Sequence, residues 1–166
     1  MTPGEALERA VMAGNEWYLA QNIVLVTKVP TPIKVLGKVR KTAQGREFTA
    51  CFERRATCDF LGIFLQSPGG HYGPRVKDSL ALECKSTTAA RLPYSAVQPQ
   101  QRQWLDAAQW SYLLIEFLGT GTETGKSACR LVPWSALHSS RSMGPEDGFV
   151  VDAVRWLDPV LRAANP

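Results

Sequence analysis

The chain has 166 residues, of which 45% are hydrophobic and 20% charged, and this composition is typical of a globular domain with a hydrophobic core. Its 19 Lys and Arg residues exceed its 15 Asp and Glu residues, so the modest formal charge of +4 matters mainly through where the charges lie. The longest apolar runs are too short to span a membrane, and the N-terminus lacks the basic and apolar regions of a signal peptide. We therefore expect a cytoplasmic protein with no membrane partner.

The first element is a predicted helix over residues 2–22. Thr2 is a suitable N-cap, Pro3 suits the first helical position, and Glu5 completes a capping box. Apolar residues follow at helical spacing. The sequence I-V-L-V-T-K-V at 23–29 predicts a strand, and P-T-P-I at 30–33 ends it because proline cannot continue a central strand.

Residues 34–47 are basic and weakly apolar and turn at Gly45, which predicts an exposed hairpin arm, and residues 48–53 alternate like a strand that returns to the body. The segment 28–55 holds eight positive and two negative residues, so the positive charge is concentrated in one place, as phosphate binding requires. A solvated hairpin without a ligand is the alternative. The arm has no aromatic ladder, so contact with the DNA backbone is favoured over base reading. The candidate DNA-binding residues are Lys34, Lys38, Arg40, Lys41, Arg46, Arg54 and Arg55.

The rest of the chain predicts alternating strands and helices. Strands are expected over 58–65 and 79–85 as hairpin partners, a helix over 99–109, a strand over 110–119 and a terminal helix near 153–164. The strand at 128–134 is expected at an edge, because Pro133 would break a central strand. This order predicts an α/β fold with a mixed sheet in a single domain over 1–166. We expect Trp104, Trp110 and Trp134 in the core or in a dimer interface, and His71 and His138 at the surface.

The cysteines point to a reducing environment. No two of them form a C-x-x-C pair, and only two histidines are present to help bind zinc. Reduced cysteines within the fold are therefore favoured over a disulfide framework or a zinc site. The four residues are Cys51, Cys58, Cys84 and Cys129.

The stretch A-L-E-C-K-S-T-T at 81–88 places an acid and a base on one face of a strand, because residues two apart point the same way. Glu83 and Lys85 share that face. Asp59 opens the preceding strand, so in a hairpin its carboxylate can converge with that of Glu83. Two carboxylates so close repel unless a cation lies between them, and hard oxygens suit Mg²⁺ or Mn²⁺. The metal would activate a water, and Lys85 could orient or deprotonate it. The pattern D…(D/E)xK is typical of one large nuclease superfamily, although Glu-x-Lys also occurs as a solvated pair.

Five stretches of the chain occur in a distinctive order, with a P-T-P-I element followed by D…ExK. They are N-E-W-Y-L-A-Q-N-I-V-L-V-T-K-V-P-T-P-I-K-V (15–35), A-T-C-D-F-L-G-I-F (56–64), A-L-E-C-K-S-T-T (81–88), Q-Q-R-Q-W-L-D-A-A (100–108) and S-Y-L-L-I-E-F (111–117). In these stretches, and over residues 5 to about 118, the chain resembles the RecU family of Holliday-junction resolvases. This resemblance implies a restriction-endonuclease-like mixed sheet flanked by helices, a homodimer, and a basic β-hairpin stalk, here near 34–47, that enters the centre of the junction.

The resemblance also implies roles for individual residues. Asp59 and Glu83 fall on metal-binding carboxylates, and Lys85 falls on the catalytic lysine. Gln101 falls on a helix glutamine near the metal and is a third candidate metal ligand. Two further active-site positions fall on Thr57 and Glu8. The family often has His-Gln where this chain has Gln100 and Gln101, which puts the role of position 100 in doubt.

We therefore predict a Mg²⁺-dependent endonuclease that resolves four-way DNA junctions by paired symmetric nicks during recombination and repair. A recombinase or a branch-migration helicase is a further candidate partner, and the host would be a bacterium or a phage-infected bacterium. Two alternatives remain: a restriction- or repair-type nuclease of the same superfamily that cuts duplex DNA, and a non-catalytic junction-binding protein.

Overall fold

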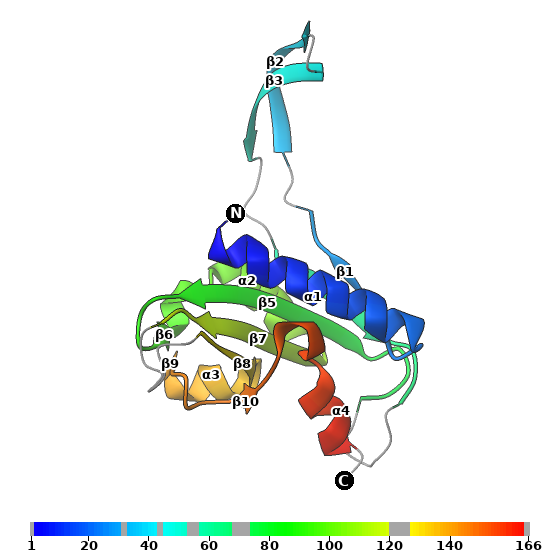
Figure 1. Ribbon diagram of the computed structural model, residues 1–166, viewed down its shortest axis with the longest axis vertical. Helices are drawn as coiled ribbons and strands as arrows, with labels where there is room; N and C mark the ends of the chain where they lie inside the picture. Colours follow the sequence, from blue (N-terminus) through cyan, green and yellow to red (C-terminus); the bar gives the residue numbers. More distant parts are fainter. Residues whose placement is uncertain are drawn as a thin grey trace.

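The fold is built on one six-stranded sheet (Figure 1), seen in a computed structural model that describes residues 2–30, 33–42, 45–52, 57–67, 74–119 and 127–164. Side chains of residues 31–56 lie outside this description. Among the described strands β5 and β7 run parallel, and the other neighbours in the sheet are antiparallel, so the predicted mixed sheet is confirmed. In spatial order the strands are β1 (Val24–Lys28), β4 (Phe60–Phe64), β5 (Ser79–Thr87), β7 (Trp110–Phe117), β8 (Ala128–Pro133) and β10 (Phe149–Val150).

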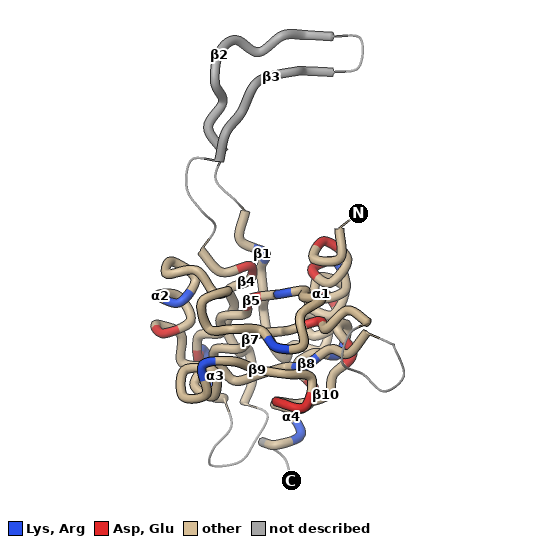
Figure 2. Tube along the Cα trace, turned by 90° about the vertical axis from the view of Figure 1, so that its left-hand side faces the viewer, with Lys and Arg blue, Asp and Glu red and all other residues tan. Residues whose placement is uncertain are grey.

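Helices cover both faces of the sheet. Figure 2 shows α1 on one side of the strands and α2 and α3 on the other. Two 3-10 turns, η1 (Tyr94–Ala96) and η2 (Ala153–Arg155), precede α2 and α4. The short strands β6 (Leu92–Pro93) and β9 (Ser142–Met143) pair with each other in a separate antiparallel sheet. The helices are α1 (Pro3–Ala20), α2 (Pro99–Ala107), α3 (Trp134–Ser140) and α4 (Asp158–Ala164).

The basic segment forms a separate antiparallel pair of strands. β2 (Ile33–Thr42) pairs with β3 (Gly45–Phe52), and the register runs from Ile33 opposite Phe52 to Thr42 opposite Gly45. The strand predicted over residues 48–53 is confirmed for 48–52, which belong to β3 and pair with β2, whereas residue 53 lies outside the described residues. Alternation predicts a strand but does not identify its partner.

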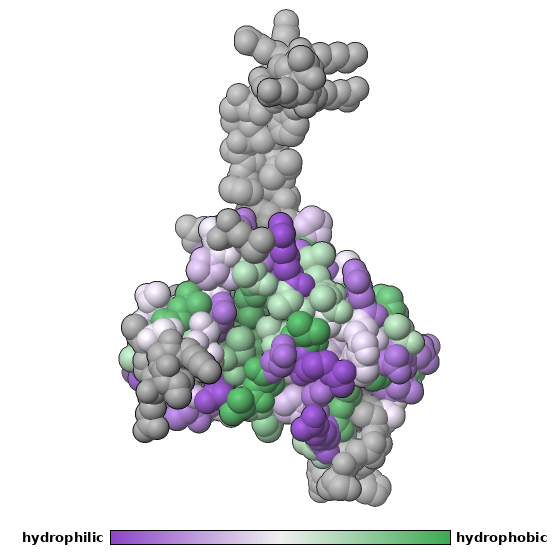
Figure 3. Space-filling view, in the orientation of Figure 1, coloured by the Kyte–Doolittle hydropathy of each residue, from purple (hydrophilic) through white to green (hydrophobic). Residues whose placement is uncertain are grey.

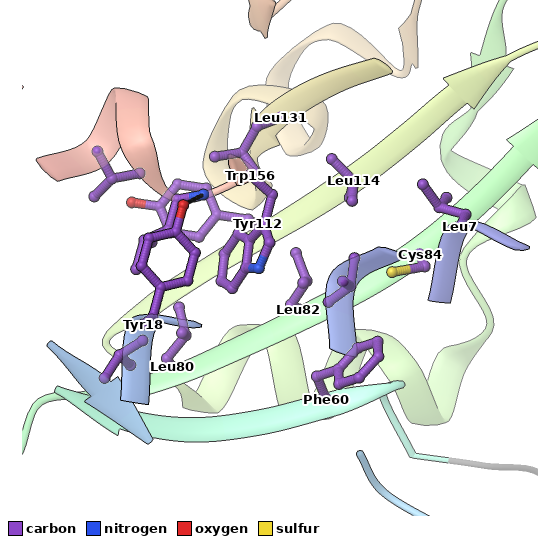
Figure 4. Close-up of a cluster of buried hydrophobic side chains, with 14 of the residues drawn as sticks. Leu7, Tyr18, Phe60, Leu80, Leu82, Cys84, Tyr112, Leu114, Leu131 and Trp156 are labelled. Atoms are coloured by element: carbon purple, nitrogen blue, oxygen red, sulfur yellow. Dashed lines mark hydrogen bonds between the residues drawn. The ribbon is translucent and has the colours of Figure 1, made fainter. Parts of the chain in front are cut away.

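The first helix begins as its sequence predicts. The Glu5 backbone N–H donates to Thr2 Oγ1 at 3.3 Å, and the Thr2 N–H donates to Glu5 Oε2 at 2.7 Å, which completes the capping box. Leu7, Val11 and Tyr18 of this helix are buried against one face of the sheet, in a cluster with Leu82 and its neighbours (Figure 4). Burial of these apolar surfaces is the main force that holds α1 on the strands.

The C-terminal segment closes the same core. Trp156 is fully buried there, and its Nε1–H donates to Asn15 Oδ1 at 3.1 Å. The Tyr18 hydroxyl donates to Asp158 Oδ1 at 2.8 Å and accepts from the Leu157 N–H at 3.1 Å. Burial, followed by the bond to Asp158, raises the pKa of Tyr18. Figure 3 views this α1 side of the sheet, where hydrophobic residues gather in the middle of the face with hydrophilic residues around them.

A second core lies on the α2 and α3 side. Leu105 of α2 and Leu137 of α3 pack there against Leu113, Ile115 and other residues of the sheet. Trp134 Nε1–H donates to Asp106 Oδ1 at 2.6 Å and so ties α3 to α2. The sheet is thus buried on both faces, as expected where a helix links two parallel strands.

Several C-terminal elements differ from the sequence prediction. β8 is not an edge strand, because β10 pairs with it on the outside. Pro133 is the last residue of β8, where it does not disturb a central strand, and α3 follows at once. His138 is exposed in this helix beside the rings of Tyr94 and Trp134, so its predicted place at the surface is confirmed, whereas His71 lies outside the described residues. α3 has seven residues, too few for helical periodicity to be recognised in a sequence.

The cysteines that the structure describes are free: Cys58 and Cys84 are buried and Cys129 is partly exposed, whereas the side chain of Cys51 lies outside the described residues. No helix among the described residues is both long and apolar enough to cross a membrane.

The contact between α1 and the C-terminal segment can be tested at Gly14. A Cβ at this position would overlap the backbone carbonyl of Val154, which cannot move aside like a flexible side chain. We expect Gly14→Ala to lower the free energy of unfolding in urea by roughly 1–3 kcal/mol, the usual cost of overpacking. Gly4→Ala in the same helix meets no atom within 4 Å and is the matched control, expected to be neutral or slightly stabilising. Equal stability of the two variants would contradict the close packing.

Candidate active site

The predicted acids are brought together by the pairing of β4 and β5. Phe60 lies opposite Leu82, so Asp59 at the entry to β4 lies beside Glu83. The Asp59 backbone N–H donates to Glu83 Oε2 at 3.1 Å, and the Cys84 N–H donates to Asp59 Oδ2 at 2.8 Å. The Glu83 carboxylate is therefore held by the backbone of Asp59, and the Asp59 carboxylate by the backbone of the residue that follows Glu83. The prediction that these two side chains converge is confirmed, while their catalytic roles stay predictions.

Alternation along β5 separates the site from the core. Leu82 and Cys84 belong to the core under α1, whereas Ala81 belongs to the core on the α2 side. Glu83 and Lys85 share the side of Ala81, because residues two apart on a strand point the same way. Both therefore meet α2.

Glu83 is a buried acid whose pKa is raised. Its side chain is 1% exposed, and burial, followed by the charge of Asp59, raises its pKa to about 8, although Lys85 acts in the opposite direction. Burial, with a contribution from Glu8, also raises the pKa of Asp59. Because the pKa values of both acids are raised, the positive charge near them does not fully compensate for placing two carboxylates close together in a buried site.

α2 provides the polar partners of Glu83. Lys85 Nζ lies 2.7 Å from Glu83 Oε1 and donates to Gln101 Oε1 at 3.2 Å. Gln101 Nε2 donates to Glu83 Oε1, and the Gln98 N–H donates to Gln101 Oε1 at 2.9 Å. The first turn of α2 thus orients both the acid and the lysine. The assignment of Gln101 as a metal ligand stays a prediction, because here its oxygen already accepts from two donors.

Glu8 and Lys28 form an ion pair at the same end of the sheet. The hydrogen bond to Glu8 is the largest cause that raises the pKa of Lys28, and the charge of Asp59 adds to it. Lys28 ends β1 opposite Phe60, and the Val29 N–H donates to the Asp59 carbonyl at 2.8 Å. Sequence reasoning counted Lys28 with the basic segment and not with the site. Only the pairing of β1 with β4 reveals this position.

The remaining predicted residues divide into two groups. Thr57 Oγ1, two residues before Asp59, is buried and has no hydrogen-bond partner within the described part of the chain. The seven candidate DNA-binding residues lie among those whose side chains the structure does not describe. The chain that links β1 to β4 contains β2 and β3, so this basic segment leaves the main sheet after Lys28, which lies opposite Phe60, and the chain rejoins the sheet at β4.

The donor atoms of this site fit a hard divalent cation. Among the described residues, no three His, Cys, Asp or Glu side chains lie close enough to form a metal site by themselves. Mg²⁺, however, is commonly bound by one or two carboxylates with water completing its coordination. Asp59 and Glu83 supply two such groups, and their raised pKa values mean that a cation would favour the ionised form of both.

The raised pKa of Glu83 predicts a pH-dependent stability. Between pH 4.5, where this acid ionises in the unfolded chain, and about pH 8, where it ionises in the folded one, rising pH favours the unfolded state. The loss is up to about 1.4 kcal/mol for each pH unit crossed. In EDTA, Glu83→Gln should therefore unfold at a higher temperature than the parent at pH 9, and the gap should close near pH 4. A gap in melting temperature that is constant over this range would contradict the assignment.

Comparison with known proteins places these residues in one family. The RecU family profile, described as "Recombination protein U", matches residues 2–119. A Holliday junction resolvase RecU of Streptococcus equi subsp. zooepidemicus (strain MGCS10565) is 29% identical over 105 residues, which cover 60% of this chain and 50% of the relative. That of Streptococcus pneumoniae (strain Hungary19A-6) is 26% identical over 105 residues, covering 62% and 48%.

A third relative, Holliday junction resolvase RecU of Streptococcus pyogenes serotype M1, is 32% identical over 71 residues, which cover 42% of this chain and 33% of the relative. The chain thus spans about half the length, or less, of the curated relatives it matches. The family profile covers α1 through β7 and contains Glu8, Asp59, Glu83, Lys85 and Gln101. With this match over most of its length, the chain belongs to the RecU family.

Proposed function

We propose that this protein is a metal-dependent endonuclease that resolves four-way DNA junctions. The observation that carries the proposal is a pair of adjacent acids with a lysine beside them: the Asp59 N–H donates to the buried Glu83, the Cys84 N–H donates to Asp59, and Lys85 lies 2.7 Å from Glu83. Membership of a family whose relatives are named Holliday junction resolvases supports the substrate. The basic segment, which lies in the chain between β1 and β4 and starts at Lys28 opposite Phe60, supports binding of a polyanion there.

The proposed reaction is hydrolysis of a phosphodiester. The oxygen of a water forms a bond to phosphorus, one P–O bond to a sugar breaks, and the departing oxygen takes up a proton. Asp59 and Glu83 would hold a Mg²⁺ ion, for which Mn²⁺ would substitute, and this ion supplies charge neutralisation and a more acidic bound water. Lys85 can donate to the phosphate or to the attacking water, and it offsets negative charge as that charge develops. Gln101 holds Lys85 and Glu83 in place.

We propose further that two copies act together. A homodimer with two-fold symmetry matches a four-way junction, which is itself roughly two-fold, so two identical sites would nick two symmetric strands. In this proposal β2 and β3 form a stalk that enters the junction centre. Action during recombination and repair, with a recombinase or a branch-migration helicase as partner, belongs to the same proposal.

Cleavage of a labelled synthetic four-way junction beside a linear duplex of the same sequence tests the proposal. We expect paired symmetric nicks on the junction alone in Mg²⁺ and none in EDTA. Glu83→Gln should lose at least 100-fold in cutting rate, on the scale of losing one main charge-stabilising group, yet keep junction binding. Glu116→Gln makes the same change on neighbouring β7, where the carboxylate accepts from Ser86, and should cut normally.

Other outcomes of this experiment decide between the alternatives. Equal cutting of both substrates would indicate a duplex-cutting nuclease. Binding without cutting in any metal would indicate a non-catalytic junction-binding protein. Equal rates for Glu83→Gln and the parent would refute the active-site assignment.

The basic segment generates a separate prediction. Arg40→Ala combined with Lys41→Ala should weaken junction binding and reduce the slope of log K against log salt by up to about 2, since each lost phosphate contact removes about 0.9. Arg162→Ala removes a highly exposed positive charge on α4 and is the control, expected to leave the slope unchanged. An unchanged slope in the double variant would show that this segment does not contact phosphates.

A further inference from the structure

Trp104 is an exposed aromatic side chain on the helix that orients the site. It lies in the second turn of α2 and is 43% exposed, so it is not in the core, while the other half of the expectation, a dimer interface, stays a prediction. Among the described residues it has neither a ring contact nor a side-chain hydrogen bond. Trp17 on α1 is similarly exposed at 38%, but the guanidinium of Arg155 covers its ring at 3.8 Å. Trp104 thus presents an uncovered apolar ring to its surroundings.

Helix geometry defines the side of α2 on which Trp104 lies. Leu105 points into the core, and Asp106, 100° further round, bonds to Trp134 of α3. Trp104 lies 100° round in the opposite direction, on the flank away from α3, and Gln101 lies between it and Leu105. Gln101 meets Glu83. The free flank of α2 therefore faces the β5, β4 and β1 side of the sheet.

Within the described part of the chain, the sheet on this flank carries exposed apolar side chains. Leu25 and Ile63 are register partners in β1 and β4, and each is 39% exposed. Ile63 shares its face with Asp59, because the two residues are four apart along the strand. α2 connects the parallel strands β5 and β7, so it runs antiparallel to β5. It therefore extends from Gln101, beside Glu83, toward the level of Leu61 on β4. Trp104 thus lies on the same side of the sheet as the two acids and the exposed side chain of Ile63.

We propose that Trp104 stacks on a nucleobase next to the scissile phosphate and so helps the enzyme select junctions over duplexes. The inference rests on the proposed function, since a phosphate placed at Asp59 and Glu83 brings its neighbouring nucleotides onto this flank. Trp104 is about 4.5 Å further along the helix axis than Gln101, and successive nucleotides rise about 3.4 Å per strand. The ring is therefore within one or two nucleotides of the cut. A base in a continuous duplex is already stacked on both sides, whereas one at a crossover can offer a face to an aromatic ring.

The test measures binding and base stacking in the Glu83→Gln background, where cutting does not consume the substrate. 2-Aminopurine is placed in turn at each crossover position and at the flanking nucleotides of a four-way junction. We expect Trp104→Ala to weaken junction affinity by about 5- to 150-fold, as for loss of one stacked base, and to abolish quenching at the position that the parent quenches. Trp104→Phe should keep that quenching, and Trp17→Ala, the exposed tryptophan across the sheet, should keep both properties.

Two results would overturn the inference. Unchanged affinity and quenching in Trp104→Ala, with a folded circular dichroism spectrum, would exclude stacking. A dimeric parent that becomes monomeric on Trp104→Ala in sedimentation velocity would mean that a second copy of the protein covers the ring. If the Glu83→Gln protein without further change bound junction and duplex equally, the proposed junction specificity would itself fail, and the role of Trp104 with it.

Discussion

The two backbone hydrogen bonds that hold Asp59 and Glu83 depend on a single strand register. Glu83 accepts the backbone N–H of Asp59, and Asp59 accepts that of Cys84, so main-chain groups help to position both carboxylates. A slip of one residue between β4 and β5 would turn Glu83 and Lys85 toward α1 and bring Leu82 to the site. The apolar residues that alternate with the acids prevent this, because they would lose their burial. The packing of the core thus fixes the strand register that places Asp59 and Glu83 beside each other.

The site departs from the usual rules of stability. Glu83 is almost fully buried, and its local partners offset only part of the cost of removing its charge from water, since burial remains the dominant influence on its pKa. Lys85 forms an ion pair with this one acid, and Gln101 donates a hydrogen bond to it. Such an arrangement is hard to explain as an ordinary surface ion pair, for which exposure would remove the cost. It is the kind of local conflict expected at functional positions.

The parts of the site that the sequence predicts are those set by local rules. Two-residue alternation places Glu83 and Lys85 on one face, and the capping box at Thr2 defines the start of α1. The site residue that was missed, Lys28, depends on pairing between strands separated by more than thirty residues, which no local pattern reports. For the same reason alternation predicts the strand at 48–52 without identifying β2 as its partner, and β10 and α3 are too short to produce a periodic signal. The exposure of Trp104 depends on which part of the sheet remains uncovered, and that too is a tertiary property.

The elements after β7 lie outside the family match, yet they complete both cores. Leu131, Trp156 and Leu157 are fully buried on the α1 side, and Leu137 is fully buried on the other. β8 also pairs with β7 along its length, so its loss would leave that central strand with an open edge. The portion that carries the family resemblance is therefore not an independent folding unit. Any chimera that transplants residues 2–119 onto another member of the family must also transplant, or replace, the hydrophobic surface that this later segment provides.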